Sequence, residues 1–287
     1  MINVLITGGS GFIAGAVRTR LADFPDRYRV ESISLRTTGW EERGFSGFDC
    51  VVHTAGIAHV NPDPSRTEAY FRVNRDLTLA AARRAKADGV GQFVFLSSAI
   101  VYGDASPAGA RRVIDPDTLP APANAYGRSK LEAEEGLRAI ADPGFRVAVL
   151  RPPMVYGRGC KGNYNALCAM AKKLPAFPRF ENRRGVLYVE NLAECIRLII
   201  DGREQGLFFP QDERVVSTSE LTAQIARAHG WRIALVPGFG PALRLLGGRG
   251  TVRRAFGDMA YDPAMTLRPE GYRRFDFETS IRKTEIE

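Results

Sequence analysis

Histidine and cysteine are scarce in this 287-residue chain, and it has no long apolar segment. The four cysteines form no Cys-x-x-Cys pair and have no zinc-ligand spacing to His53, His59 or His229. We therefore expect free thiols in a reducing compartment, and no metal site. No apolar run approaches the roughly 20 residues that span a bilayer, so the sequence predicts no membrane partner.

The N-terminus lacks a basic leader and a cleavage site, because residues 1–6 already have the pattern of a strand. This predicts a cytoplasmic protein. The formal net charge is +8, but the basic residues are dispersed along the chain rather than clustered with aromatic residues. We therefore expect no nucleic-acid partner. A positive field also suits a small anionic substrate such as a nucleotide diphosphate.

Buried strands alternate with helices through the first half of the chain. The segment 49–54 (DCVVHT) is mostly apolar, as is typical of a strand covered on both faces of a parallel sheet. Such alternation predicts a Rossmann-type, doubly wound α/β fold, with ligands at the carboxyl ends of the strands. The expected strands are 4–7, 29–35, 49–54, 93–97 and 146–150, and the expected helices are 13–24, 68–87 and 126–140.

Composition changes after Leu150, where prolines, glycines and basic residues become frequent. We expect residues 1–155 to form the NAD(P)-binding Rossmann domain, with residues 186–202 packing back on it. Residues 156–185 and 203–287 are expected to form a small substrate-binding region that closes over the substrate. Its predicted elements are a helix near 164–173, a strand at 207–210, and a helix that follows the capping box at 217–220.

A glycine-rich loop, TGGSGFIA at residues 7–14, follows the first strand and opens the first helix. Glycine at positions Gly8 and Gly11 lets the backbone turn tightly and approach a pyrophosphate closely. The third position of the pattern, where a small residue allows helix–strand packing, is Ala14. The helix N-terminus then offers free N–H groups to the phosphates. Between a strand and a helix, this loop predicts a dinucleotide site.

The end of the second strand carries the residues that distinguish NAD from NADP. An acidic residue there usually binds the adenosine ribose of NAD. Here the strand ends in Ser34, Leu35 and Arg36. Arg36 is placed to meet a 2′-phosphate and Ser34 to donate a hydrogen bond to it, which favours NADP over NAD. A solvated loop arginine fits the same pattern, so both interpretations stay open.

Tyr126 and Lys130 are four residues apart and so share one face of a helix. A phenol with a pKa of about 10 is a poor base at neutral pH, and lowering that pKa to about 7 takes about 4 kcal/mol. We expect the Lys130 ammonium to contribute to this shift, because it favours the phenolate. Ser98 follows the buried strand 93–97, where its hydroxyl can bind a carbonyl oxygen beside Tyr126.

Motifs along nearly the whole chain resemble the extended short-chain dehydrogenase/reductases. That group includes the NAD-dependent epimerase/dehydratase family. The order and spacing of the motifs are specific to it. They are TGGSGFIA (7–14), HTAG (53–56), VN (73–74), FLSSAIVYG (95–103), YGRSK (126–130), LRPPMVYGRG (150–159) and RRGVLYVENLAE (183–194).

The resemblance implies roles for single residues. Ser98, Tyr126 and Lys130 would form a catalytic triad, with Ser98 also facing the substrate. Asn163 and Arg184 would face the diphosphate of the substrate, where a bidentate arginine suits phosphate oxygens. The long helix before the fourth strand and the helix of Tyr126 form the dimer face in related enzymes, so a homodimer is expected. The implied cofactor-binding residues are Gly8, Gly11, Phe12, Ile13, Arg36, Thr54, Ala55, Gly56, Asn74, Ser97, Tyr126, Lys130, Pro153 and Val155.

Two departures from the family's pattern narrow the prediction. In its sugar 4,6-dehydratases, an aspartate and a glutamate follow the position of Ser98. Ala99 and Ile100 follow it in this sequence, so dehydratase activity is not expected. The usual third strand, with its adenine-binding aspartate, is missing or shortened between Arg36 and Asp49.

With RPPMVYG (151–157), KGNY (161–164) and NRR (182–184) together, the chain resembles the hexosamine 4-epimerases and 4-keto-sugar reductases of that family. The resemblance implies an NAD(P)-dependent enzyme that acts at C4 of a UDP-type nucleotide sugar, in the synthesis of surface polysaccharide. An epimerase would return the hydride to the other face of the sugar, and a reductase would consume NADPH. Arg36 favours the reductase. One alternative is an NADP-dependent reductase of a non-nucleotide ketone or aldehyde, which would not need Asn163 and Arg184. Another is a non-catalytic NADP-binding regulator on the same fold.

Overall fold

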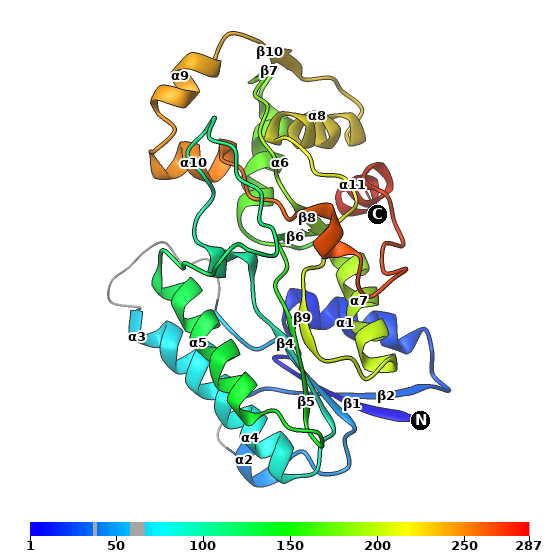
Figure 1. Cartoon of the computed structure of the whole chain (residues 1–287). Helices are drawn as coiled ribbons and strands as arrows, with labels where there is room; N and C mark the ends of the chain where they lie inside the picture. The colour runs from blue at the N-terminus through cyan, green and yellow to red at the C-terminus, as the bar shows by residue number, and fades with distance from the viewer. Residues whose placement is uncertain (37–38, 58–66, 287) are drawn as a thin grey trace.

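The computed structural model describes residues 1–36, 39–57 and 67–286, so His59 lies outside the described residues. A central sheet is flanked by helices (Figure 1), and each strand pairs in parallel with its neighbours. This confirms the predicted doubly wound α/β fold. In spatial order the strands are β2 (Tyr28–Ile33), β1 (Ile2–Thr7), β3 (Cys50–His53), β4 (Gln92–Leu96), β5 (Arg146–Leu150) and β9 (Gly206–Phe208).

Helices cover both faces of the sheet. Successive side chains of a strand point to opposite faces, and here both faces are apolar and must be buried. In β1, Val4 and Ile6 pack on one face and Leu5 on the other. The first face is covered by α1 (Phe12–Ala22) and α7 (Val189–Asp201), and the second by α4 (Leu77–Ala87) and α5 (Ala125–Ile140).

The connection from β2 to β3 holds no further strand among its described residues. It contains only the short helix α2 (Trp40–Arg43), and β2 is therefore an edge of the sheet. The predicted loss or shortening of the usual third strand is thus confirmed. Trp40 is buried and stacks on Phe45 with ring centroids 5.8 Å apart, so its side chain belongs to the core.

The helix expected over residues 68–87 is not regular. It consists of α3 (Thr67–Tyr70), a π-helical turn η2 (Phe71–Asp76) and then α4, so the prediction of one uniform helix is wrong at its centre. A π-helical turn holds one more residue than an α-helical turn, and such turns often occur at functional sites. Here the turn carries Asn74, which is fully buried.

The residues after β5 build most of a second lobe at the carboxyl end of the sheet (Figure 1), with a core of its own. Among the described residues, no helix is both long and apolar enough to cross a bilayer.

The predicted capping box of Ser217 and Glu220 is present at the start of α8. The lobe contains α6 (Asn163–Lys173), α8 (Thr218–Ala228), α9 (Gly240–Leu245), α10 (Gly250–Phe256), α11 (Phe277–Glu285), the parallel pair β6 (Met154–Tyr156) and β8 (Val186–Tyr188), and the parallel pair β7 (Ala176–Pro178) and β10 (Ala234–Val236).

A buried ion pair joins the end of β5 to α5. The Nε of Arg151 lies 3.1 Å from each carboxylate oxygen of Glu134, and the two side chains are only 4% and 1% exposed. The hydroxyl of Ser97, at the end of β4, donates to the same carboxylate. Arg151 Nη1 also donates to the Tyr102 hydroxyl at 2.7 Å. These contacts fix α5 against the carboxyl ends of two neighbouring strands.

We expect Glu134→Gln to lower the free energy of unfolding by about 3 kcal/mol, because Arg151 would keep a buried charge without its counter-ion. Urea unfolding followed by circular dichroism measures this loss. Glu135→Gln, at the exposed next position of the same helix, is the matched control and should change stability by less than about 0.5 kcal/mol. Equal stability of the two variants would show that the ion pair does not fix the helix.

Candidate active site

The loop after β1 forms a cradle that requires glycine. Gly8 has a φ of +79°, and a Cβ there would lie 2.8 Å from the Cα and N of Ala55. Gly11 is the N-cap of α1, and it makes no side-chain capping bond. The N–H groups of the first helical turn, which includes Phe12 and Ile13, therefore remain available to an anion. These residues fit the pyrophosphate of a dinucleotide.

The predicted ribose-binding segment is fixed at the carboxyl end of β3. The Thr54 hydroxyl donates to the carbonyl of Thr7 at 2.7 Å. Asn74 accepts a hydrogen bond from the N–H of Ile57 at 2.9 Å and donates to the Ile57 carbonyl at 3.1 Å. It also donates to the Ser129 hydroxyl on α5 at 3.2 Å. Asn74 therefore joins this segment to α5.

Basic side chains lie around the end of β2 and the glycine loop. Arg36 is exposed, and its backbone N–H donates to the Ser34 hydroxyl at 3.3 Å. Arg18, on α1, donates to the carbonyl of Gly9 at 3.0 Å. A Cβ on Gly9 would lie 2.5 Å from the Cβ of Ser32, so the end of β2 lies directly against the loop. Sequence reasoning missed Arg18, because no motif position marks it.

Ser98, Tyr126 and Lys130 meet at the carboxyl end of β4. The Ser98 side chain hydrogen-bonds to the Tyr126 phenol. Lys130 is buried, and its ammonium donates to the carbonyl of Leu96 at 2.7 Å. A Cβ on Gly56 would lie 3.4 Å from this ammonium, which therefore lies between β4 and the predicted ribose-binding segment. The structure thus brings the three predicted catalytic residues to one place.

Burial controls the ionisation of the two helix residues. It raises the pKa of Tyr126 to about 12; Tyr70, whose ring centroid is 5.9 Å away, adds to the rise, and the hydrogen bond with Ser98 opposes it. Burial also lowers the pKa of Lys130 to about 8, and the Glu134 carboxylate opposes that fall. In the chain alone the pKa of Tyr126 is therefore raised rather than lowered, because desolvation outweighs the other contributions. A phenolate at neutral pH requires further positive charge beside Tyr126.

A buried histidine that sequence reasoning did not use supports the site. Nδ1 of His53 is 2.8 Å from the Thr7 hydroxyl, and Nε2 is 3.0 Å from the Thr78 hydroxyl. Because Thr78 donates to the carbonyl of Asn74, it accepts from Nε2, and Nδ1 accepts from Thr7. Burial, with a contribution from the charge of Lys130, lowers the pKa of His53 to about 3. The imidazole is therefore neutral and serves as a hydrogen-bonded support.

The predicted nicotinamide-side residues lie in the segment that follows β5. An N–H at the start of the 3-10 helix η3 (Ala99–Tyr102) donates to the carbonyl of Pro152 at 2.9 Å. Pro153 and Val155 are half-buried beyond it, and Val155 packs against the cores of both lobes. A Cβ on Gly157 would lie 3.2 Å from the Phe12 ring, so this segment also lies against the start of α1.

The two predicted diphosphate ligands occupy different elements. Arg184 is half-buried, and its Nη1 donates to the carbonyl of Gly257 at 3.3 Å. Burial lowers the pKa of Arg184, and the charge of Asp258 opposes this shift. No carboxylate of the described residues forms an ion pair with Arg184, so its guanidinium retains donors for an anion. Asn163 is exposed as the first residue of α6.

Three possible metal ligands that are far apart in the sequence lie together in the second lobe. Atoms of Cys168, His229 and Glu285 lie within 4.8 Å of one another. Glu285 also accepts from the Tyr164 hydroxyl at 2.8 Å and from His229 Nε2 at 2.7 Å, and the ammonium of Lys172 is 3.3 Å away. A lysine at the carboxylate competes with a cation, so we interpret the cluster as a hydrogen-bonded anchor of α11.

Known proteins match most of this chain in sequence. A model of the NAD dependent epimerase/dehydratase family matches residues 4–207. A UDP-glucose 4-epimerase of Vibrio cholerae is 34% identical over 186 residues, which are 62% of this chain and 56% of that protein. An N-acetyl-alpha-D-glucosaminyl-diphospho-ditrans,octacis-undecaprenol 4-epimerase of Escherichia coli O157:H7 is 28% identical over 247 residues, which are 79% of this chain and 72% of that protein. The chain thus spans little more than half the length of the first relative.

Solved structures share the fold along the whole chain. The structure of MoeE5 in complex with UDP-glucose and NAD is 22% identical and superposes with a TM-score of 0.75. The alignment covers 98% of this chain and 97% of that one. This likeness shows the Rossmann-type fold, including the second lobe.

We expect Gly8→Ala to weaken dinucleotide binding by about tenfold or more, because the added Cβ would meet the backbone of Ala55 at a strained φ. Gly15→Ala on α1 is the matched control, since a Cβ there meets nothing within 4 Å and alanine favours a helix. Calorimetric titration with NAD and NADP measures the affinities. Full affinity in Gly8→Ala would place the pyrophosphate elsewhere.

Proposed function

The chain belongs to the NAD-dependent epimerase/dehydratase family, and on this premise we propose that it performs hydride chemistry at C4 of a UDP-linked sugar. The observation that carries the proposal is the meeting of Ser98, Tyr126 and Lys130 beside the glycine cradle. Relatives named as 4-epimerases, at 34% and 28% identity, support the same reaction.

Each member of the triad has a distinct task in this proposal. Tyr126 exchanges a proton with the C4 oxygen of the sugar. Ser98 donates a hydrogen bond to that oxygen, where negative charge develops. Lys130, as a cation below its pKa of about 8, favours the phenolate of Tyr126 and offers donors to a ribose hydroxyl. A bound nicotinamide supplies the hydride acceptor and donor. Ala99 and Ile100 offer no acid beside Ser98, so elimination of water is not part of the proposal.

We propose NADP as the preferred cofactor, because Arg36 is exposed at the end of β2 and Arg18 lies at the glycine loop. This preference favours a reductase over an epimerase. A cytoplasmic homodimer acting in surface-polysaccharide synthesis completes the proposal. The small residues Ala80, Ala81 and Ala85 would suit close helix packing at a dimer face, or equally an intramolecular partner. Ala81 and Ala85 are fully buried against the sheet, so a dimer face on α4 and α5 would be formed by other side chains of these helices.

The diphosphate is common to nucleotide-linked and lipid-linked sugars. The relative from Escherichia coli is named for a sugar joined through a diphosphate to undecaprenol. A lipid-diphosphate sugar is therefore a second candidate substrate. Arg184 would bind the diphosphate of either carrier, and the chemistry at C4 would be the same.

We expect the protein either to interconvert the 4-epimers of a UDP-sugar or to oxidise NADPH with a 4-keto UDP-sugar. Tyr126→Phe should lower kcat by about 10²–10⁴, because the phenol that exchanges the proton is gone. Dinucleotide affinity should persist. Chromatography of the sugar nucleotides and the absorbance of NADPH measure the two activities. Interconversion without net oxidation would exclude the reductase.

Tyr70→Phe is the matched control, because it keeps an aromatic ring beside Tyr126 and should retain turnover within about tenfold. Lys130→Met tests the charge assignment. Since the ammonium favours the phenolate, its loss should move the alkaline rise of the rate to higher pH. Wild-type turnover in Tyr126→Phe would refute the triad, and a chain that binds NADP without any turnover would favour the regulator.

We expect Arg184→Ala to raise KM for UDP-sugars by about tenfold or more, because a charge-assisted contact to the diphosphate is lost. Arg183→Ala, at the neighbouring position, is the control and should leave KM within about twofold. Initial-rate kinetics measure both. If Arg184→Ala kept its affinity for UDP-sugars, the diphosphate assignment would fail and a non-nucleotide ketone or aldehyde would become the better substrate.

A further inference from the structure

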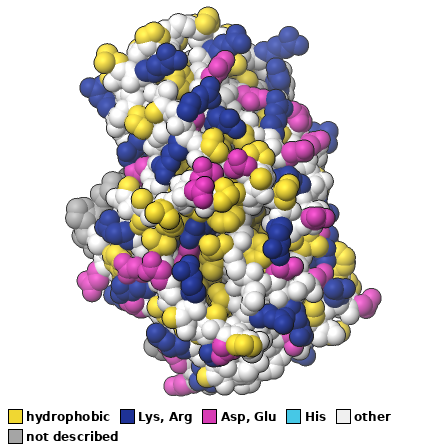
Figure 2. Space-filling model, in the orientation of Figure 1, with side chains coloured by type: hydrophobic (Ala, Val, Ile, Leu, Met, Phe, Trp, Pro, Cys, Tyr) yellow, Lys and Arg dark blue, Asp and Glu magenta, His cyan; other side chains and the backbone are white. Residues whose placement is uncertain are grey.

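The outer end of the second lobe, residues 231–256, is both basic and apolar; we term it the basic tip. From Gly230 to Gly257 the sequence holds five arginines and no aspartate or glutamate. In the space-filling view, basic and apolar side chains gather at this end of the molecule, over β10 and α9 (Figure 2). The basic tip therefore carries positive charge with no acidic residue of its own to balance it.

Large apolar side chains of the basic tip face solvent. The sequence of α9 is mostly apolar (GPALRL), yet the helix has no buried residue. Leu245 is 87% exposed, and Phe239, which precedes the helix, is 48% exposed. Trp231 and Val236, around β10, are also exposed. Single exposed apolar residues are ordinary, but several on one segment indicate an interaction surface.

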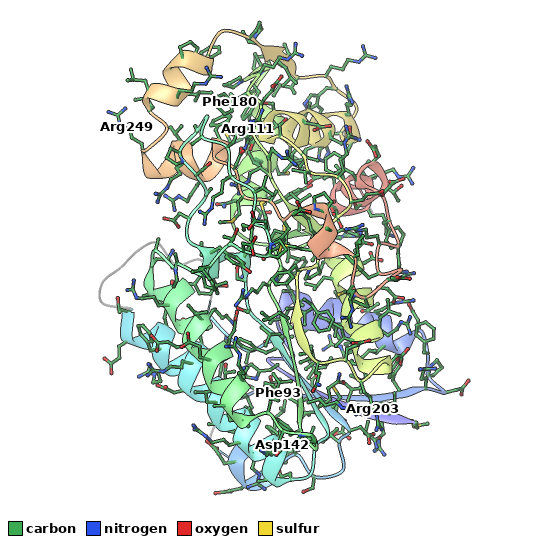
Figure 3. All side chains as sticks on the ribbon, in the orientation of Figure 1. Phe93, Arg111, Asp142, Phe180, Arg203 and Arg249 are labelled. Carbon is green, nitrogen blue, oxygen red and sulfur yellow. The ribbon has the colours of Figure 1, made fainter. Side chains whose placement is uncertain are left out.

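Unpaired cations accompany these side chains. Arg244, Arg249 and Arg254 are exposed, and in the described part of the chain no carboxylate forms an ion pair with them. Arg249 projects outward between α9 and α10 (Figure 3). Arg253 differs, because it pairs with Asp104. The described part of the chain therefore leaves most of the positive charge of the basic tip without a counter-ion.

We propose that the basic tip docks the protein on an anionic phospholipid surface. Arginines on an amphipathic segment bind lipid phosphates, while Phe239 and Leu245 enter the boundary between headgroups and acyl chains. A nucleic acid would use the arginines but would leave Leu245 in water. The expectation of no membrane partner came from the lack of a spanning segment, which does not bear on peripheral docking.

The basic tip is connected to the active site by polar contacts. Arg253 of α10 pairs with Asp104, and Asn124 donates to the same carboxylate at 3.4 Å. The Asn124 side chain in turn accepts from the N–H of Gly127 at 2.9 Å and caps α5, the helix of Tyr126. The surface that docks on lipid is therefore linked, through these contacts, to the start of the helix that carries Tyr126.

The test is sedimentation of the full chain with vesicles of phosphatidylglycerol and phosphatidylethanolamine, compared with phosphatidylcholine vesicles. We expect binding to the anionic vesicles alone, weakened by high salt. The double variants Phe239→Ser with Leu245→Ser, and Arg244→Gln with Arg249→Gln, should each bind about tenfold more weakly. Leu119→Ser removes a leucine that is 81% exposed outside the basic tip and should bind like the wild type.

Thermal unfolding and dinucleotide affinity unchanged from the wild type establish that the variants are folded. Failure of the wild type to bind anionic vesicles would overturn the proposal. So would equal binding by the variant without Phe239 and Leu245, because charge alone would then account for it. A dimer that this variant dissociates in sedimentation velocity would assign the surface to a second copy of the chain instead. None of these outcomes depends on the sugar chemistry proposed above.

Discussion

The carboxylate of Glu134, which is shielded from water, determines the arrangement of the active site. It binds Arg151 at the end of β5 and Ser97 at the end of β4, and so holds α5 at the carboxyl edge of the sheet. Glu134 lies one helical turn beyond Lys130, which lies one turn beyond Tyr126. A charge buried this deeply is tolerated only when it is paired and hydrogen-bonded. The same pairing therefore sets the position of Tyr126 and Lys130, the two helix residues of the proposed triad.

Burial away from water shifts the pKa values of the acidic and the basic groups of the site in opposite directions. Burial holds Tyr126 in its neutral form, and it weakens the hold of Lys130 and His53 on their protons. For His53 this is an advantage, since a neutral imidazole satisfies two threonine hydroxyls. For Tyr126 it means that proton transfer requires a cation brought close to the ring. In the proposed mechanism, acid–base chemistry at Tyr126 would therefore be coupled to occupation of the cradle around Gly8.

The parts of the fold that rest on local pattern were predictable from the sequence. Alternation of apolar runs and the spacing of Gly8, Gly11 and Ala14 predicted β1, α1 and the parallel sheet. The short connection between Arg36 and Asp49 indicated the lost strand. Glu134 was within reach of the same reasoning, because an acid four residues beyond Lys130 on a buried helical face needs a partner.

Other features depend on contacts that no local pattern encodes. The π-helical turn at Asn74 depends on hydrogen bonds to Ile57 and Ser129, which are distant in sequence. The pKa of Tyr126 depends on how deeply the folded chain buries the ring. Likewise, Cys168 and Glu285 are separated by 117 positions, so spacing could not reveal their contact.

Among the residues that the structure describes, no strand pairs with the outer edge of β2, so one row of its backbone N–H and C=O groups has no strand partner. Such a row is a template on which a strand of another molecule could add. The strand carries the exposed Arg29 and the half-buried Glu31, and Arg43 forms an ion pair with Glu31 at 2.8 Å. Pairing the β2 edges of two molecules would remove water from these charged side chains, which costs free energy. Charge on this edge therefore disfavours edge-to-edge pairing at the place where the family's usual third strand would lie.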